Sequence, residues 1–245
     1  MNDPKHKLIP YRKKDKWGFC DKNKKIIIQV QYDFVGDFHE GFVRVQLNNK
    51  WGFINESGKE ITDIKYDEVE DFRNGFARIN FGVKRKEGSG VFSGKWGVIN
   101  VSGQEIIPAQ YNRIGEYFND LFPVMLNGKW GFVDITGKQM ISPKYEDIGK
   151  FSEGLVPVKL DGKWGYINME GRMVINNNYS SVSEFMDGVA KVELNGWWGL
   201  INIKGRGITP IKYDEITDRN DTLVIVKSGG KWGYLAKSGT EYFED

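Results

Sequence analysis

The 245-residue chain has very little cysteine and histidine and no excess of either charge. Its single cysteine, Cys20, cannot form an intrachain disulfide, and one cysteine with two histidines gives no zinc-ligand spacing. The 35 Lys and Arg residues oppose 33 Asp and Glu residues, so bulk charge does not favour nucleic acid as a partner. We therefore expect no cofactor, no metal and no nucleic-acid partner.

Long hydrophobic runs are also missing. No segment approaches the roughly 18 to 20 apolar residues that a membrane-spanning helix needs. The charged N-terminus, MNDPKHKLIPYRKKDK, lacks the apolar region of a secretory signal. These two features, with the single cysteine, predict a cytoplasmic protein without a membrane span. No apolar period of 3.6 residues is sustained either, which predicts an all-β chain.

Glycine and aromatic residues are abundant, and they recur in register. The chain contains 30 glycines and 14% aromatic residues. The dipeptide Trp-Gly begins seven units, at Trp17, Trp51, Trp96, Trp130, Trp164, Trp198 and Trp232. Five of the six spacings are 34 residues, and the 45-residue spacing from Trp51 to Trp96 indicates an 11-residue insertion at about residues 82–94. A fixed period of this length is typical of a repeat protein.

Other columns follow the same register. A tyrosine lies 15 residues after the Trp in six units, as Tyr32 does after Trp17. Six residues further on lies an aromatic column, Phe38, Phe72, Tyr117, Phe151 and Phe185, in which Arg219 replaces the aromatic residue of the sixth unit. Recurrence in register predicts that these columns build the repeat and its core.

The stretch GLVPVKLDGKWGYIN, Gly154 to Asn168, has the pattern of a β-hairpin. Apolar residues alternate along its first half, and Asp161-Gly162 supplies a tight turn. The return strand places the Trp and the residue two positions later on one face. A glycine directly after each Trp predicts close approach of another backbone or ring.

These motifs resemble the WG-repeat family, which is found mostly in bacterial proteins. The resemblance is carried by Lys-Trp-Gly-Phe-Ile-Asn/Asp-x-x-Gly-Lys, then Tyr-Asp-x-Ile and Phe-x-x-Gly-Leu-Ala-x-Val, and it covers Leu8 to Phe243. The family is regarded as a binding or interaction repeat without attributed catalysis, so the resemblance implies a non-enzymatic role. The hairpins also resemble those of cell-wall-binding repeats, on hairpin pattern alone.

The predicted architecture is one repeat domain, residues 1–245, of tandem 34-residue β-hairpin units. We expect them to stack as an open superhelix, a β-solenoid, with a closed toroid or β-propeller as the alternative. Seven hairpins but six complete connectors favour the open form. A 34-residue unit cannot bury its aromatic face alone, so we assign the seven register tryptophans to the structural core.

Polar residues that recur with the repeat are expected to fix turns through bonds to the backbone. They include the column Asp33, Asp67, Glu146 and Asp214, and the strand-ending column Asp21, Asn55, Asn100, Asp134, Asn168 and Asn202. Cys20 takes an apolar strand position, His39 a surface turn, and His6 lies in the basic N-terminal segment. We therefore expect no catalytic residue.

Departures from the repeat are better candidates for function. The insertion carries Lys84, Arg85 and Lys86, either as a solvated hairpin or as a basic contact for an acidic partner. Trp197 replaces the lysine that precedes Trp-Gly in the six other units. Neighbouring strand residues point to opposite faces, so Trp197 should be exposed while Trp198 joins the core.

The sequence thus predicts a non-enzymatic scaffold that binds a protein partner through its extended repeat surface. The alternative is a glycan or cell-envelope binding module that uses exposed aromatic residues. A hydrolase would require two carboxylates brought together in a deep cleft.

Overall fold

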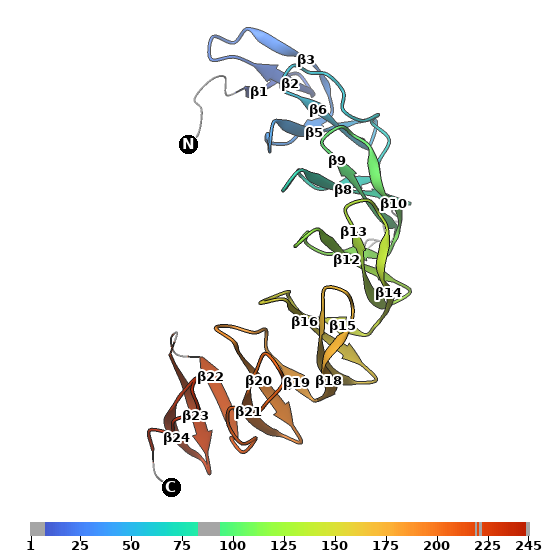
Figure 1. Ribbon diagram of the computed structural model, residues 1–245. Coiled ribbons are helices and arrows are strands. Elements are labelled where there is room, and N and C mark those ends of the chain that lie inside the picture. Colours follow the sequence, from blue (N-terminus) through green and yellow to red (C-terminus); the bar gives the residue numbers. More distant parts are fainter. Residues whose placement is uncertain (1–7, 83–93, 219, 221, 244–245) are drawn as a thin grey trace. The chain divides into compact units, whose positions relative to one another are not determined.

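The computed structural model describes residues 8–82, 94–218, 220 and 222–243, and every regular element in these ranges is a β-strand (Figure 1). The strands form small antiparallel sheets of three or four members, one for each Trp-Gly hairpin. The predicted all-β class is confirmed.

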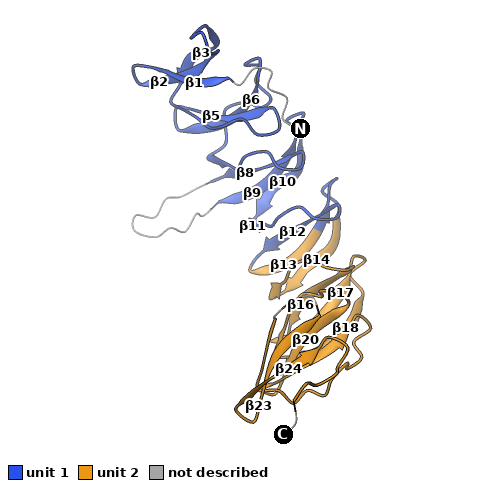
Figure 2. Cartoon of the chain, turned by 90° about the vertical axis from the view of Figure 1, so that its left-hand side faces the viewer, with its two compact units in different colours: residues 1–127, 133–138 blue, residues 128–132, 139–245 orange. Residues whose placement is uncertain are grey.

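The chain divides into two compact units, residues 1–127 with 133–138 and residues 128–132 with 139–245 (Figure 2). Unit 1 contains the sheets β1 (Ile9–Lys13), β2 (Lys16–Cys20) and β3 (Ile26–Tyr32); β4 (Phe34–Val35), β5 (Phe42–Leu47) and β6 (Lys50–Asn55); and β7 (Glu68–Val69), β8 (Phe76–Phe81), β9 (Lys95–Asn100) and β10 (Glu105–Tyr111).

The fourth group of strands contains the division: β11 (Arg113–Ile114), β12 (Leu121–Leu126), β13 (Lys129–Asp134) and β14 (Gln139–Tyr145). Unit 2 continues with β15 (Asp147–Ile148), β16 (Leu155–Leu160), β17 (Lys163–Asn168) and β18 (Met173–Tyr179); β19 (Ser181–Val182), β20 (Val189–Leu194) and β21 (Trp197–Asn202); and β22 (Glu215–Asp218), β23 (Leu223–Ser228) and β24 (Lys231–Ala236).

The predicted hairpin is present, with β16 pairing against β17. Its turn residues Asp161 and Gly162 have φ angles of 52° and 74°. Two successive positive φ values match the right-handed twist of the flanking strands, which explains the Asp-Gly and Asn-Gly turns. The strand after the glycine turn then pairs back on the Trp strand, as β18 does on β17.

The glycine after each Trp leaves room for the segment that follows the glycine turn. The register shifts between the pairs Trp164–Tyr179 and Tyr166–Ile175, so β18 bulges over Gly165. A Cβ atom on Gly165 would lie 2.5 Å from the Ile175 carbonyl oxygen, which is closer than real Cβ contacts. The predicted close approach is therefore confirmed.

An inner Trp-Gly strand such as β6 separates two hydrophobic clusters. Phe19 and Ile54 belong to one cluster, while Phe53, beside Ile54 on the same strand, belongs to the next. Since consecutive strand residues point to opposite faces, both faces of the return strand are buried. The core therefore consists of successive clusters between neighbouring sheets within each unit.

The prediction that the register tryptophans are core residues needs correction. Trp17, Trp51, Trp96, Trp130, Trp164 and Trp198 are only half-buried, and Trp232 is 57% exposed. The fully buried rings are instead those of the tyrosine column, such as Tyr32 and Tyr66. The reason is position, because each Trp is the second residue after the hairpin turn and its large ring packs on the edge of a cluster.

Candidate functional site

The strand-ending polar residues cap the glycine turns, as predicted. Asp134 Oδ1 accepts hydrogen bonds from the backbone N–H groups of Thr136 at 2.8 Å and Lys138 at 3.0 Å. The hydrogen bond from the Thr136 hydroxyl lowers the pKa of Asp134. The same kind of side-chain to backbone bond is made by Asp21, Asn55, Asn100, Asn168 and Asn202. These oxygens are therefore occupied by structural bonds.

The acidic column after the repeating tyrosine caps the hairpin turns. Glu146 Oε2 accepts a hydrogen bond from the Gly162 N–H at 2.9 Å, and Glu146 Oε1 lies 3.5 Å from Lys129 Nζ. The Gly162 bond lowers the pKa of Glu146. Asp33 and Asp67 cap their turns in the same way and pair with the lysines at the same position as Lys129. This column is also structural.

Trp197 interrupts the lysine column, and its side chain is 47% exposed, as predicted. The carboxylate that follows it in register, Asp214, accepts a hydrogen bond from the Gly230 N–H at 3.2 Å. Trp198 is half-buried and packs against the cluster that contains Leu200. The two adjacent indoles therefore lie on opposite faces of β21, and Trp197 is the more exposed of the two.

Other sequence candidates are placed as follows. Lys84, Arg85, Lys86 and His6 lie outside the described residues. Cys20 is a buried free thiol in β2, as its apolar strand position predicts. His39 lies in an exposed turn with Nε2 3.6 Å from Asp71 Oδ2.

The last repeat exposes further aromatic residues. Tyr234 is 41% exposed, whereas Phe53 and Tyr166 at the same repeat position are 1% and 0% exposed. Trp232 and Tyr242 are 57% and 61% exposed. The sequence pattern did not predict the exposure of Trp232 and Tyr234, because in the other repeats the first column is half-buried and the second is buried.

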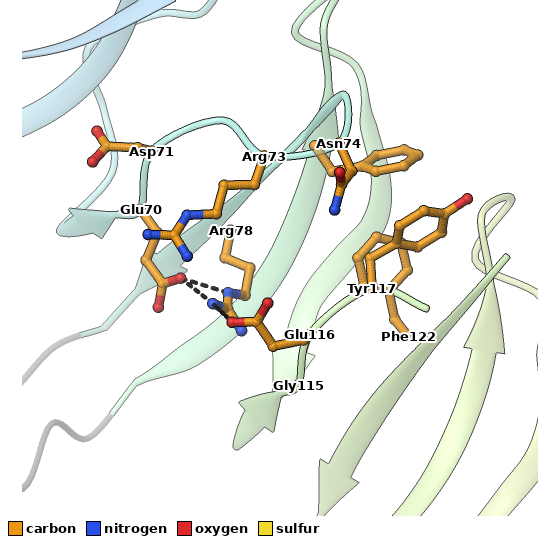
Figure 3. A pocket seen from close by; sticks show the side chains of 10 residues that line it. Glu70, Asp71, Arg73, Asn74, Arg78, Gly115, Glu116, Tyr117 and Phe122 are labelled. Atoms are coloured by element: carbon orange, nitrogen blue, oxygen red, sulfur yellow. Dashed lines mark hydrogen bonds and ion pairs between the residues drawn. The ribbon is translucent and has the colours of Figure 1, made fainter. Parts of the chain in front are cut away.

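A small cavity lies between β8 and β12 in unit 1 (Figure 3). We call this place the filled junction, because the rings of Phe76, Tyr117 and Phe122 pack there with centroids 4.9 to 5.2 Å apart. The cavity that remains has a volume of about 40 Å³.

Charged groups close the other side of the filled junction. Arg78 Nε donates to Glu70 Oε2 at 2.6 Å, and Arg78 Nη1 donates to the Ile114 carbonyl oxygen at 2.8 Å. Glu116 is a more distant partner, with Oε1 3.8 Å from Arg78 Nη2 (Figure 3). The guanidinium group thereby ties one repeat to the next.

The corresponding place in unit 2, between β20 and β23, holds a larger cavity of about 170 Å³, and we call it the open junction. Its described lining residues are Ser183, Glu184, Met186, Val189, Lys191, Leu200, Asp218, Val224 and Lys237. None of these is aromatic. Val189 stands at the repeat position of Phe76, Val224 at that of Phe122, and Lys191 at that of Arg78.

Ion pairs flank the open junction. Lys191 Nζ contacts Asp218 Oδ2 at 2.5 Å, and Lys237 Nζ contacts Asp187 Oδ2 at 3.0 Å. The two lysine side chains are 21% and 14% exposed, respectively. The repeat position of Tyr117 is taken by Arg219, which lies outside the described residues. That break in the aromatic column was the sequence signal for this cavity.

The described part of the chain contains neither a cluster of metal ligands nor a membrane-spanning helix. Nowhere in it do three His, Cys, Asp or Glu side chains come together as metal ligands would. Within the same residues, no helix has the length and apolar character needed to cross a membrane.

Comparison with solved structures finds distant likeness in fold. A eukaryotic initiation factor, a β-propeller protein, aligns with a TM-score of 0.51 and 10% identity, over 96% of this chain and 73% of that chain. A Kluyveromyces lactis Hsv2 aligns with a TM-score of 0.40 and 11% identity, over 86% of this chain and 75% of that chain. For a Hsv2 with loop 6CD replaced by a Gly-Ser linker, the TM-score is 0.39 at 11% identity, over 68% of this chain and 61% of that chain. At 10% identity, the similarity to the initiation factor concerns the fold alone.

No curated protein matches the sequence. The family model described as "WG containing repeat" matches six units, at residues 17–51, 51–82, 96–130, 130–164, 164–196 and 198–232. These matches span most of the chain and follow the Trp-Gly register. The chain therefore belongs to the WG-containing-repeat family.

Proposed function

We propose that this chain is a non-enzymatic binding scaffold that engages a protein partner through its repeat surface. The observation that carries the proposal is the exposure of large aromatic side chains in the last two repeats. Trp197, Trp232, Tyr234 and Tyr242 are each between 41% and 61% exposed. Trp and Tyr are enriched among the residues that supply most of the binding energy in protein interfaces.

The polar residues support the same proposal. The recurrent carboxylates and amides act as caps of turns, as Asp134 and Glu146 illustrate. A catalytic acid or base needs a group that is free to exchange protons with a substrate. In the described repeats these side chains hold the backbone instead, so they support a scaffold rather than an enzyme.

The test is quantitative affinity capture from native lysate with the full chain as bait. We expect a stoichiometric protein partner, and we expect Trp197→Lys to reduce its recovery several-fold. Lysine occupies this position in the six other units, so the variant should fold normally. Lys231→Ala changes the same position in the next repeat and is the matched control. Absence of a stoichiometric partner would count against the proposal.

Glycan or cell-envelope binding is the second candidate, because exposed indoles such as Trp197 and Trp232 offer flat apolar faces to sugar rings. A panel of polysaccharides and peptidoglycan tests it. Binding that is lost in Trp197→Ala would favour this candidate, and a panel without binding would remove it.

We also propose the open superhelical array and a cytoplasmic setting. The stacking of successive sheets on shared clusters supports the first, and a single cysteine supports the second. Small-angle scattering tests the array, because a compact chain of this length has a radius of gyration of about 18 Å. An open array should exceed this value clearly, and a value of about 18 Å would favour a closed ring.

A further inference from the structure

We propose that the open junction is a binding site for an aromatic side chain, phenylalanine or tyrosine, carried by a partner polypeptide. This inference deepens the proposed function and rests on it for the identity of the partner as a protein. The site itself consists of described residues between β20 and β23.

The repeats themselves show what normally occupies this place. At other junctions the ring of the aromatic column packs on the residue two positions after the Trp. Phe38 lies 5.0 Å from Phe19, Phe72 lies 4.9 Å from Phe53, and Phe185 lies 4.8 Å from Tyr166, measured between ring centroids. In two of these three contacts the ring of the column is buried, since Phe72 and Phe185 are each 2% exposed, while Phe38 is half-buried. The junction is therefore built to bury a six-membered ring.

At the open junction the neighbouring rings are replaced by smaller side chains. Val189 stands where Phe42 and Phe76 stand, and Val224 stands where Phe122 stands. The cavity is about 170 Å³, against about 40 Å³ where three rings fill the junction. A buried apolar cavity of about 150 Å³ is large enough to bind benzene. The volume thus accommodates one phenyl or phenol ring.

The walls are apolar on one side and charged on the other. Leu200 and Val224 are 1% and 2% exposed, and Met186, which adapts readily to different ligands, is 62% exposed. Lys191 and Lys237 also line the cavity. A cation near the face of an aromatic ring is attracted by the ring's electron-rich face. This charge complementarity favours an aromatic ring over an aliphatic group of equal size.

The polar side of the lining favours a polypeptide as the source of the ring. Ser183, Glu184 and Asp218 line the same cavity as the apolar floor. Asp218 and Asp187 have side chains that are 62% and 61% exposed, so the charged groups reach solvent. An aromatic residue of a polypeptide matches this arrangement, because its ring can contact the apolar floor while its peptide groups stay hydrated beside the charged groups.

The experiment is a titration of the full chain, with ¹³C-labelled methyl groups, using N-acetyl-phenylalaninamide and the peptide acetyl-Gly-Phe-Gly-amide. We expect saturable shifts of the methyl resonances of Met186, Val189, Leu200 and Val224. Binding should weaken at least about tenfold when alanine or cyclohexylalanine replaces phenylalanine. Equal binding of all three, or no shift at these methyl groups, would overturn the proposal. Binding of toluene without binding of the peptide would also overturn it, because the source would then be a small molecule.

Val189→Phe is the specific variant, because phenylalanine occupies this position as Phe42 and Phe76 in other repeats. We expect it to fold and to weaken peptide binding at least about tenfold by filling the cavity. Val189→Ala leaves the cavity open and should retain binding. A folded Val189→Phe variant that binds the peptide like the wild type would contradict the proposal.

Affinity capture separates this inference from the proposed function. If Val189→Phe and Trp197→Lys both lose the partner, both proposals are supported. If Val189→Phe retains a partner that Trp197→Lys loses, the scaffold function stands and the open junction is not its site. If the wild type captures no partner, the scaffold function fails and the titration alone decides whether the cavity binds aromatic side chains.

Discussion

The filled junction in unit 1 and the open junction in unit 2 occupy the same place in the repeat and differ in what they contain. At the first, Phe76, Tyr117 and Phe122 pack ring against ring. At the second, Val189 and Val224 stand at the positions of Phe76 and Phe122, and the cavity is about four times larger. The hairpins around both places have the same register.

This difference teaches that the hairpin scaffold and the packing between repeats are separable. The scaffold is held by turns, backbone ladders and the close approach at each Trp-Gly. Because these features are local, they persist when the rings between repeats are lost. A repeat array can therefore change one junction into a site without changing its fold.

The largest expected effect comes from emptying the filled junction. Phe122→Ala should cost about 3 to 5 kcal/mol of unfolding free energy, because it removes a buried ring and leaves a void. Val224→Ala at the open junction should cost less, about 2 kcal/mol, since a cavity already adjoins that side chain. Urea denaturation of both variants measures the difference. Equal costs would show that the two junctions are packed alike.

Some features of the two junctions could be predicted from the sequence and others could not. The hairpins, the close approach at Gly165 and the caps at Asp134 follow from local patterns, and all of them were predictable. The exposure of the Trp232 side chain was not predictable, because it depends on whether another sheet covers the strand. The sequence signalled the cavity only through Arg219, because the cavity also requires small residues at Val189 and Val224, which come from separate strands.

The next largest effect is a difference in stability between variants of the charged residues at the two junctions. Arg78→Met removes hydrogen bonds to Glu70 and to the Ile114 carbonyl and should cost about 1 to 3 kcal/mol. Lys191→Met breaks a pair with the exposed Asp218 and should cost less than about 1 kcal/mol. Thermal unfolding of the two variants provides the comparison. A larger loss of stability for Lys191→Met than for Arg78→Met would contradict the expectation that Arg78 contributes more to its junction than Lys191 does.

Filling the open junction should have a smaller effect of opposite sign. Val189→Phe should raise the unfolding free energy by about 1 kcal/mol, because it buries a ring in existing space. The reciprocal change Phe76→Val should lower stability, because it opens the filled junction. Chemical denaturation measures both, and a loss of stability in Val189→Phe would show that the cavity cannot accept a ring.

Acid pH should have the smallest effect on the difference in stability between the two junctions, because the titrating caps belong to both units. Hydrogen bonds lower the folded-state pKa of Asp33, Asp134 and Glu146. Their stabilising contribution is therefore complete above the unfolded-state pKa, about 4, and is lost as pH falls through the lower folded-state values. Asp134→Asn should reduce this acid sensitivity, since asparagine caps the equivalent turns. A cost difference between Phe122→Ala and Val224→Ala that vanishes at low pH would contradict this assignment.

The central claim is that the open junction receives an aromatic side chain where other repeats supply their own. Intermolecular nuclear Overhauser effects between the ring protons of acetyl-Gly-Phe-Gly-amide and the labelled methyl groups of the full chain test it most directly. We predict contacts from the ring to Met186, Val189, Leu200 and Val224. Ring contacts confined to other methyl groups, with none at these four, would contradict the account.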